Sequence, residues 1–201
     1  MTARSEKKFV EKNLPNFYNF LSKNNAIEIY KQRKILSIYF DNDSLQSYYD
    51  AEEGTRPRRK IRLRRYYNTN YFLKLNKLSD FFKQKFSLEK KITEFNTNYK
   101  LVNKIIFNKN YLSIIDEQYG FMKPVKIVLY DRSYFKLPND RITIDNNIRY
   151  YTVNNNNSFI LNNIINYSIV EFKTGQNIFL SQSNNFNTLQ SRYSKYLTSF
   201  F

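Results

Sequence analysis

The stretch RPRRKIRLRRY, residues 56–66, decides the fold, because its charges alternate with apolar residues instead of forming a simple run. Successive side chains of an extended strand point to opposite faces, so Lys60, Arg62 and Arg64 share one face. The two apolar residues between them point to the other face. If the cationic face lines a closed structure, a bound polyanion must offset the buried charge. The segment therefore predicts a β-strand that contributes to a polyanion site.

The composition indicates one sizeable folded domain, residues 1–201, with an anionic partner. The chain has 33 Lys and Arg against 17 Asp and Glu, a formal net charge of +16, and an apolar fraction of 41%. That apolar fraction argues against disorder, and the charge is large for this length. Nucleic acid, a nucleotide or polyphosphate, and an acidic membrane surface are all compatible with it.

Missing residue types exclude several kinds of chemistry. The chain has no cysteine and no histidine, so disulfides, ordinary zinc sites and imidazole catalysis are excluded, and a metal would need oxygen ligands, as Mg²⁺ or Mn²⁺ do. Three glycines are too few for a Gly-rich phosphate loop. No apolar run reaches the roughly 18 residues of a membrane span, and the start MTARSEKKF lacks an apolar signal core, so we expect a cytoplasmic protein.

Hydrophobic periodicity predicts about eight strands with a few helices. The strands are expected at 3–10, 35–40, 56–66, 71–76, 82–90, 125–135, 140–151 and 166–174. Helices are expected from Pro15 to about Asn25, as a turn or short helix at 41–50, as two short helices between 98 and 119, and at the C-terminus. Asn154 to Asn157 is typical of a hairpin tip.

Charged residues alternate on several of these strands. Arg141 with Asp145 and Glu171 with Lys173 repeat the alternation in distant segments. An antiparallel barrel with a polar, mainly cationic interior would use all of them together. We therefore predict an α+β fold: an eight-stranded antiparallel β-barrel with a few peripheral helices.

Ordered motifs add a family resemblance. They are R-x-E-x-K at 4–8, S-I-Y-F-D at 37–41, K-x-R-x-R-x-Y at 60–66, K-F at 85–86, Y-x-R at 130–132, R-I-T-x-D at 141–145, V-E-x-K at 170–173 and S-K-Y at 194–196. In this combination the chain resembles the VTC domain of polyphosphate polymerases, within the triphosphate tunnel metalloenzyme (CYTH-like) superfamily. The resemblance spans nearly the whole chain.

The resemblance implies a tunnel in which the γ-phosphoryl group of ATP passes to a growing inorganic polyphosphate chain, with Mn²⁺ or Mg²⁺. It assigns catalytic contacts to Lys8, Arg62, Arg64 and Arg132, phosphate binding to Lys60, Lys83, Lys85, Arg141 and Lys195, and the metal to Glu171 and Glu6. It leaves Arg58, Arg59 and Arg65 as rim or solvent charges. Phosphoryl transfer depends on positioning and charge neutralisation, so such a set is sufficient without histidine.

The residues also leave other readings open. Lys60 to Arg64 could be a solvated edge strand, and Glu6 and Glu171 could be surface ion-pair partners. Asp145 could ligate a metal but more often such a carboxylate orients an arginine, and Tyr39 and Tyr130 suit core packing. Lys74 and Asn76 stand where the family usually has an acid and a lysine, which would weaken the phosphate ring locally.

Three alternatives to a polymerase follow. A tunnel-fold triphosphatase would hydrolyse inorganic or RNA 5′-triphosphate, but its usual paired acids are sparse here. A nucleic-acid binder would be expected to contain a known nucleic-acid-binding module, and the sequence shows no pattern typical of one. A catalytically weakened polyphosphate binder is the third. We expect ATP and polyphosphate as partners, no nucleic acid and no transmembrane segment; a membrane or regulatory partner on another chain is left open.

Overall fold

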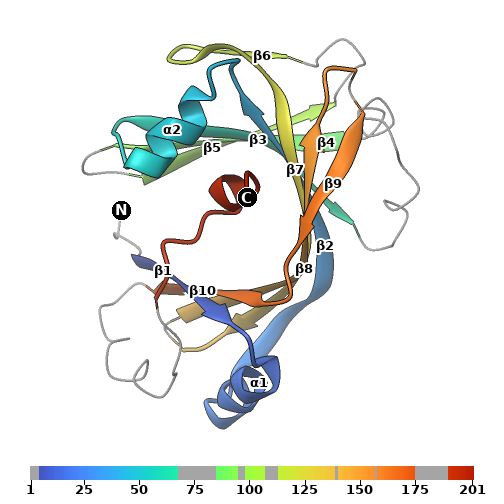
Figure 1. Ribbon diagram of the computed structural model, residues 1–201. Coiled ribbons are helices and arrows are strands. Elements are labelled where there is room, and N and C mark those ends of the chain that lie inside the picture. The colour runs from blue at the N-terminus through green and yellow to red at the C-terminus, as the bar shows by residue number, and fades with distance from the viewer. Residues whose placement is uncertain are drawn as a thin grey trace. The chain divides into compact units, whose positions relative to one another are not determined.

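The computed structural model describes residues 5–67, 85–94, 98–106, 113–138, 140–156, 158–174 and 190–201. These residues form a mostly antiparallel β-sheet with a few short helices (Figure 1). The strands are β1 (Ser5–Glu11), β2 (Ile27–Asp41), β3 (Arg58–Tyr67), β4 (Lys85–Thr93), β5 (Asn98–Ile106), β6 (Ile114–Asp116), β7 (Gly120–Lys136), β8 (Asp140–Val153), β9 (Phe159–Ile164) and β10 (Ser168–Thr174). The helices are α1 (Leu14–Lys23), α2 (Gln46–Glu53) and α4 (Lys195–Thr198).

Strand pairing follows the order β1-β10-β8-β7-β2-β3-β4-β5, with β6 paired to β7 and β9 to β8. The described chain therefore has ten strands in its sheet, where the sequence predicted about eight. Closure of the sheet into an eight-stranded barrel stays a prediction. The longest described helix, α1, has 10 residues, too few to traverse a bilayer.

The chain divides into two compact units, and the long strands β2, β7 and β8 contribute to both. Unit 1 contains Met1–Arg33, Tyr130–Ile148 and Ile164–Tyr193. Unit 2 contains Lys34–Leu129, Arg149–Asn163 and Ser194–Phe201. Whether the two act as one domain stays a prediction.

In unit 1, α1 covers one face of the sheet. Asn13 caps the helix by accepting a hydrogen bond from the Asn16 N–H, and Asn24 closes it by donating to the Phe20 carbonyl. The helix therefore ends near Asn24, as the sequence predicted, and begins at Leu14, one residue before the predicted start. Phe17 of the helix packs edge-on against Phe172 of β10, within a cluster that also includes Ile142 and Ile144 of β8. The apolar residues of β10 and β8 therefore face the helix, and their alternating neighbours face the opposite side.

In unit 2, the alternation of β3 is realised. Ile61 and Leu63 are buried in a core with Leu36 and Ile38 of β2 and Leu129 of β7. Fully burying each such side chain contributes roughly 1.5–3 kcal/mol, which fixes the register of the strand. The charged residues between them therefore lie on the other face, called here the polar face of unit 2.

One predicted segment is wrong. The two short helices expected between 98 and 119 are β5 and β6, and β5 pairs antiparallel with β4 from Lys85↔Ile106 to Thr93↔Asn98. β-Branched residues such as Val102 and Ile105 suit a strand, and the long hairpin supplies backbone hydrogen bonds that outweigh the helical spacing of the apolar residues. The predicted strand 71–76, with Lys74 and Asn76, lies outside the described residues.

Other boundaries differ in length. β2 begins at Ile27, whereas the sequence predicted a start near residue 35. The first half of the strand is mostly exposed, so it lacks the apolar pattern from which a strand is predicted. β9 was not predicted, since most of its side chains are exposed. The Asn-rich segment before it forms the hairpin tip that the sequence indicated, where the Asn154 N–H donates to the Ser158 carbonyl (2.9 Å).

Candidate functional site

The polar face of unit 2 is built from two rows of side chains that cross β2, β3 and β4. Arg62 lies opposite Tyr39 on one side and Glu89 on the other, and Arg64 lies opposite Ser37 and Ser87. Because opposed residues on neighbouring strands share a face, each arginine reaches both neighbours. The register thus determines which groups surround the two guanidinium groups.

Glu89 serves both arginines. Arg62 Nε donates to Glu89 Oε2 over 2.7 Å, and Arg64 Nη1 lies 3.4 Å from the same oxygen. Glu89 and Arg64 are buried, while Arg62 is partly exposed. The sequence analysis missed Glu89, although it alternates with Ser87 and Lys85 along β4. One carboxylate beside two guanidinium groups leaves this trio with a net positive charge.

The pKa of Tyr39 is affected by that positive charge. Its hydroxyl accepts a hydrogen bond from Arg62 Nη1 (3.1 Å), and its side chain is buried. Burial alone raises the pKa of a phenol, but the charges of Arg62, Arg64 and Lys195 outweigh burial and lower the pKa of Tyr39. Tyr39 packs in the interior as predicted, yet its hydroxyl also orients Arg62.

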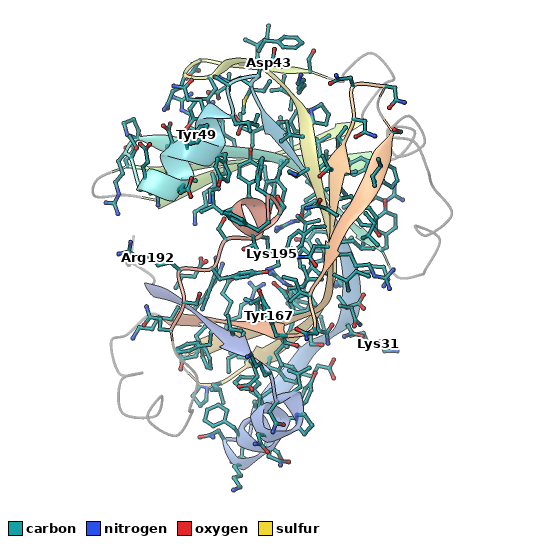
Figure 2. All side chains as sticks on the ribbon, viewed as in Figure 1. Lys31, Asp43, Tyr49, Tyr167, Arg192 and Lys195 are labelled. Carbon is teal, nitrogen blue, oxygen red and sulfur yellow. The ribbon has the colours of Figure 1, made fainter. Side chains whose placement is uncertain are left out.

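The C-terminal segment is fixed to the same face. Lys195 lies on α4 (Figure 2), and Lys60 Nζ is 3.1 Å from the hydroxyl of Ser194, the residue that caps this helix. The ring of Tyr196 stacks on Tyr39, with centroids 5.1 Å apart and planes at 22°. The Tyr196 hydroxyl donates to Asp41 Oδ2. Unit 2 therefore holds together the predicted phosphate-binding residues Lys60, Arg62, Arg64 and Lys195.

Asp41 connects the elements that carry these side chains, although no role was predicted for it from the sequence. Its carboxylate is fully buried and accepts hydrogen bonds from the N–H groups of Ser47 and Tyr48, each over 2.9 Å, as well as from Tyr196. Burial raises the pKa of Asp41, and these hydrogen bonds only partly offset that rise. The fifth residue of S-I-Y-F-D thus connects β2, the first turn of α2 and the C-terminal helix.

Unit 1 carries the predicted carboxylates. Glu6 lies opposite Lys173 and Lys8 lies opposite Glu171 on the paired strands β1 and β10. Lys173 Nζ is 3.4 Å from Glu6 and 3.0 Å from Glu171, and Lys8 Nζ is 3.2 Å from Glu6. The side chains of Glu6, Lys8, Glu171 and Lys173 thus alternate in charge along and across the two strands, a group called here the checkerboard of unit 1.

Glu171 is the more buried carboxylate of this checkerboard. Burial and the charge of Glu6 raise its pKa, but the charges of Lys173, Arg132 and Lys8 outweigh them, so the pKa of Glu171 is lowered and the group is ionised at neutral pH. Two carboxylates thus converge on one ammonium group. Mg²⁺ and Mn²⁺ bind through one or two carboxylates together with water and phosphate oxygens, so Glu6 and Glu171 fit a divalent cation.

A larger carboxylate cluster is not found, since the described residues contain no group of three or more acids that could hold a metal. Asp145 in particular is committed elsewhere. Its two oxygens accept from Arg132 Nε (2.5 Å) and Nη2 (2.7 Å), and its side chain is fully buried. Arg132 also lies over the ring of Tyr130, 5.3 Å from the centroid. Asp145 was expected to orient Arg141, with which it alternates in the sequence, but the arginine that it holds is Arg132 of the neighbouring strand β7.

The remaining predicted residues are placed as follows. Arg141 is exposed, and its guanidinium lies 5.8 Å from the ring centroid of Tyr134. Lys85 begins β4, where its backbone pairs with Ile106, but its side chain lies outside the described part of the chain, as does all of Lys83.

Arg59 is not the solvent charge that the sequence predicted. Its Nη1 lies 3.3 Å from the buried Asp116 and 3.0 Å from Glu117, and Lys90 Nζ lies 2.6 Å from Asp116. Arg59 shares a face with Ile61, so its charge is directed to the edge of the apolar core, where it must find a carboxylate. The cluster of Arg59, Lys90 and Asp116 fastens the β6–β7 hairpin to β3 and β4.

Solved structures share this fold at very low sequence identity. A "putative adenylate cyclase" from Vibrio parahaemolyticus is 12% identical, with 98% of this chain and 97% of that one covered and a TM-score of 0.54. A protein of the same description from Bacillus halodurans is 10% identical over the full length of both chains, with a TM-score of 0.54. An adenylyl cyclase homologue from Hippeastrum, described as having a dominant triphosphatase activity, is 9% identical, with 98% and 95% covered and a TM-score of 0.51. These likenesses show that the chain shares the fold of these proteins.

The family follows from sequence. The model of the VTC domain matches residues 3–200, so the chain belongs to the VTC domain family. No curated protein matches the chain in sequence.

Proposed function

We propose that this protein is a polyphosphate polymerase, which transfers the γ-phosphoryl group of ATP to the end of an inorganic polyphosphate chain. The observation that carries the proposal is the grouping of Lys60, Arg62 and Arg64 on one face of β3 with the C-terminal segment that bears Lys195. Several cations on one face suit a ligand with several negative charges. A linear triphosphate supplies such charges in a row.

Each residue has a stated role in this proposal. Arg62 and Arg64 hold phosphate oxygens, with Tyr39, Ser37 and Glu89 fixing the two guanidinium groups. Lys60 and Lys195 add positive charge from β3 and α4, and Lys8, Arg132 and Arg141 do so from unit 1. Lys83 and Lys85 belong to the same proposed set. The whole chain, residues 1–201, would act as one tunnel domain with a closed eight-stranded barrel.

Glu171 and Glu6 would hold Mn²⁺ or Mg²⁺. A divalent cation neutralises phosphate charge when it is bound, which favours attack by another anion. Lys173, which contacts both carboxylates, keeps them together in the absence of a metal. Lys8 and Lys173 stand two residues from Glu6 and Glu171, where the E-x-E pattern of a triphosphatase would have a second acid. This pattern favours transfer over hydrolysis.

Triphosphate hydrolysis is the second candidate. It is favoured by the likeness in fold to the Hippeastrum protein, whose description names a triphosphatase activity. Hydrolysis and transfer would use the same phosphate contacts and differ in the acceptor, which is water in one case and the end of a polyphosphate chain in the other.

One experiment separates these functions. The purified protein is incubated with ATP and Mn²⁺, and the products are resolved on a gel that separates polyphosphate by chain length. A polymerase gives a ladder of long chains together with ADP. Free phosphate released from tripolyphosphate without chains would establish the triphosphatase instead, and no turnover with tight polyphosphate binding would reduce the protein to a binder.

A further inference from the structure

Lys126 is a buried cation on the polar face of unit 2 that none of the sequence motifs contains. It lies on β7, where the next residue, Ile127, and Leu129 belong to the apolar core. Since side chains alternate along a strand, Lys126 points to the opposite face. Its exposed fraction is 7%, which is unusual for a lysine.

Among the described residues, the contacts of Lys126 are a hydroxyl and an aromatic ring. Its ammonium donates to Thr152 Oγ1 (2.9 Å) and lies 4.4 Å from the ring centroid of Phe200. No carboxylate of the described ranges pairs with it. An ammonium group has three donors, so a hydroxyl and an aromatic ring satisfy it only in part. Burial accordingly lowers the pKa of Lys126, because the charged form lacks compensation.

Lys126 is connected to the arginines through the C-terminal segment. Phe200 covers the Lys126 ammonium and packs edge-on against Tyr196, with ring centroids 5.3 Å apart. Tyr196 in turn stacks on Tyr39, whose hydroxyl accepts from Arg62. These contacts lie within unit 2 and on one face of its sheet. The uncompensated ammonium thus borders the same group of side chains as the proposed phosphate site.

We propose that Lys126 binds a phosphoryl group of the polyanion held on the polar face of unit 2. The inference rests on the proposed function. It adds a residue on β7, whereas the other residues of unit 2 that are proposed to bind phosphate lie on other elements. A phosphate oxygen supplies the missing negative charge and accepts the remaining ammonium donors. The phosphoryl group belongs either to the nucleotide or to the polymer.

Two lysines of one strand give a matched test. Lys126→Met removes the buried charge and keeps the length of the side chain, and Lys123→Met removes an exposed charge that pairs with Asp43. Affinity is measured by calorimetry with tripolyphosphate and, separately, with a non-hydrolysable ATP analogue. We expect Lys126→Met to weaken binding roughly tenfold or more, as the loss of a hydrogen bond to a charged group does, and Lys123→Met to leave it within about twofold.

The two probes and a second measurement make the outcome decisive. Weakening with tripolyphosphate alone places Lys126 on the polymer, and weakening with the ATP analogue places it on the nucleotide. The melting temperature of the ligand-free protein should rise in Lys126→Met, because an uncompensated buried charge is removed. Lys126→Arg keeps the charge and should retain binding. If Lys126→Met does not fold, Lys126→Gln takes its place.

Two results count against the inference in different ways. A neutral variant that binds both probes like the wild type overturns the role of Lys126, and leaves the proposed function intact. A wild-type protein that binds neither probe overturns the proposed function, and with it the ligand inferred for Lys126.

Discussion

The sheets of units 1 and 2 both have one apolar face and one polar face, but they balance the charge of the polar face differently. In unit 1 Arg132 pairs with Asp145, and Lys8 and Lys173 contact Glu6 and Glu171. In unit 2 Glu89 contacts both Arg62 and Arg64, and no carboxylate of the described residues pairs with Lys126. Among these described side chains, bases and acids are equal in number in unit 1, while bases outnumber acids in unit 2, so we expect an anion to stabilise unit 2 more. The variants below test that difference.

The largest effect is expected at the balanced pair of unit 1. Asp145→Asn removes the buried carboxylate that holds Arg132, which leaves a guanidinium of low exposure without its counter-charge. Breaking such a pair costs about 3–5 kcal/mol of unfolding free energy. Urea denaturation measures the change. Asp43→Asn breaks an exposed ion pair and is the control, with an expected cost of about 0–1 kcal/mol. Equal costs for the two variants would contradict the balance assigned to unit 1.

Two arginines on opposite faces of β3 sharpen the comparison within unit 2. Arg62→Met should lower kcat by roughly 100- to 1,000-fold, the usual loss when a group that stabilises transition-state charge is removed, with little loss of stability. Arg59→Met should do the reverse, because Arg59 fastens Asp116 at the edge of the core. Steady-state kinetics and urea denaturation are recorded for both variants. An Arg62→Met enzyme with normal kcat would show that the polar face is only a charged surface.

Glu171→Gln tests whether the carboxylates of unit 1 serve a metal. The change keeps the shape of the side chain and removes its charge, so the concentration of Mn²⁺ needed for half-maximal activity should rise by roughly 10- to 100-fold. A titration of activity with Mn²⁺ measures it. Glu117→Gln, at an exposed position, is the control and should not change the titration. An unchanged titration in Glu171→Gln would leave this residue as an ion-pair partner only.

A smaller, pH-dependent effect is expected from Asp116. Burial raises its pKa, but hydrogen bonds from Lys90 and the Gln118 N–H and the charge of Lys90 outweigh burial, so the folded-state pKa lies below the ordinary value. Its stabilisation is therefore present above the pKa of the unfolded state and is lost as pH falls through the folded-state pKa. Asp116→Asn should cost about 1–3 kcal/mol at pH 7 and less in acid. Urea denaturation from pH 7 to pH 3 measures this, and a cost independent of pH would contradict the assignment.

Features that depend on the alternation of side chains along a strand were predicted from the sequence. The alternation in residues 58–66 placed Lys60, Arg62 and Arg64 on one face, and β3 buries the residues between them. The helix after Pro15 was correct for a similar local reason, since its caps lie in the adjoining sequence. The ordered motifs identified the family, which the match over residues 3–200 confirms.

Features that depend on pairing between distant segments could not be predicted in this way. Apolar spacing at 101–115 suits a helix, and only the ladder with β4 makes 98–106 a strand. Glu89 lies opposite Arg62 because of the register between β3 and β4. Asp41 accepts a hydrogen bond from Tyr196 of α4, which is 155 residues away in the sequence. Lys126 looks like an ordinary strand lysine in the sequence, because its contact with the ring of Phe200 brings in a distant segment of the chain.

The central claim is that the arginines on the polar face of unit 2 hold a row of phosphates. Calorimetric titration of tripolyphosphate into the wild type and into the double variant Arg62→Met/Arg64→Met tests it without requiring turnover. We expect saturable binding by the wild type and an affinity at least roughly 100-fold weaker in the double variant, since two charge-assisted contacts are lost. Equal affinity in two folded proteins would contradict the account, because the phosphates would then be held elsewhere.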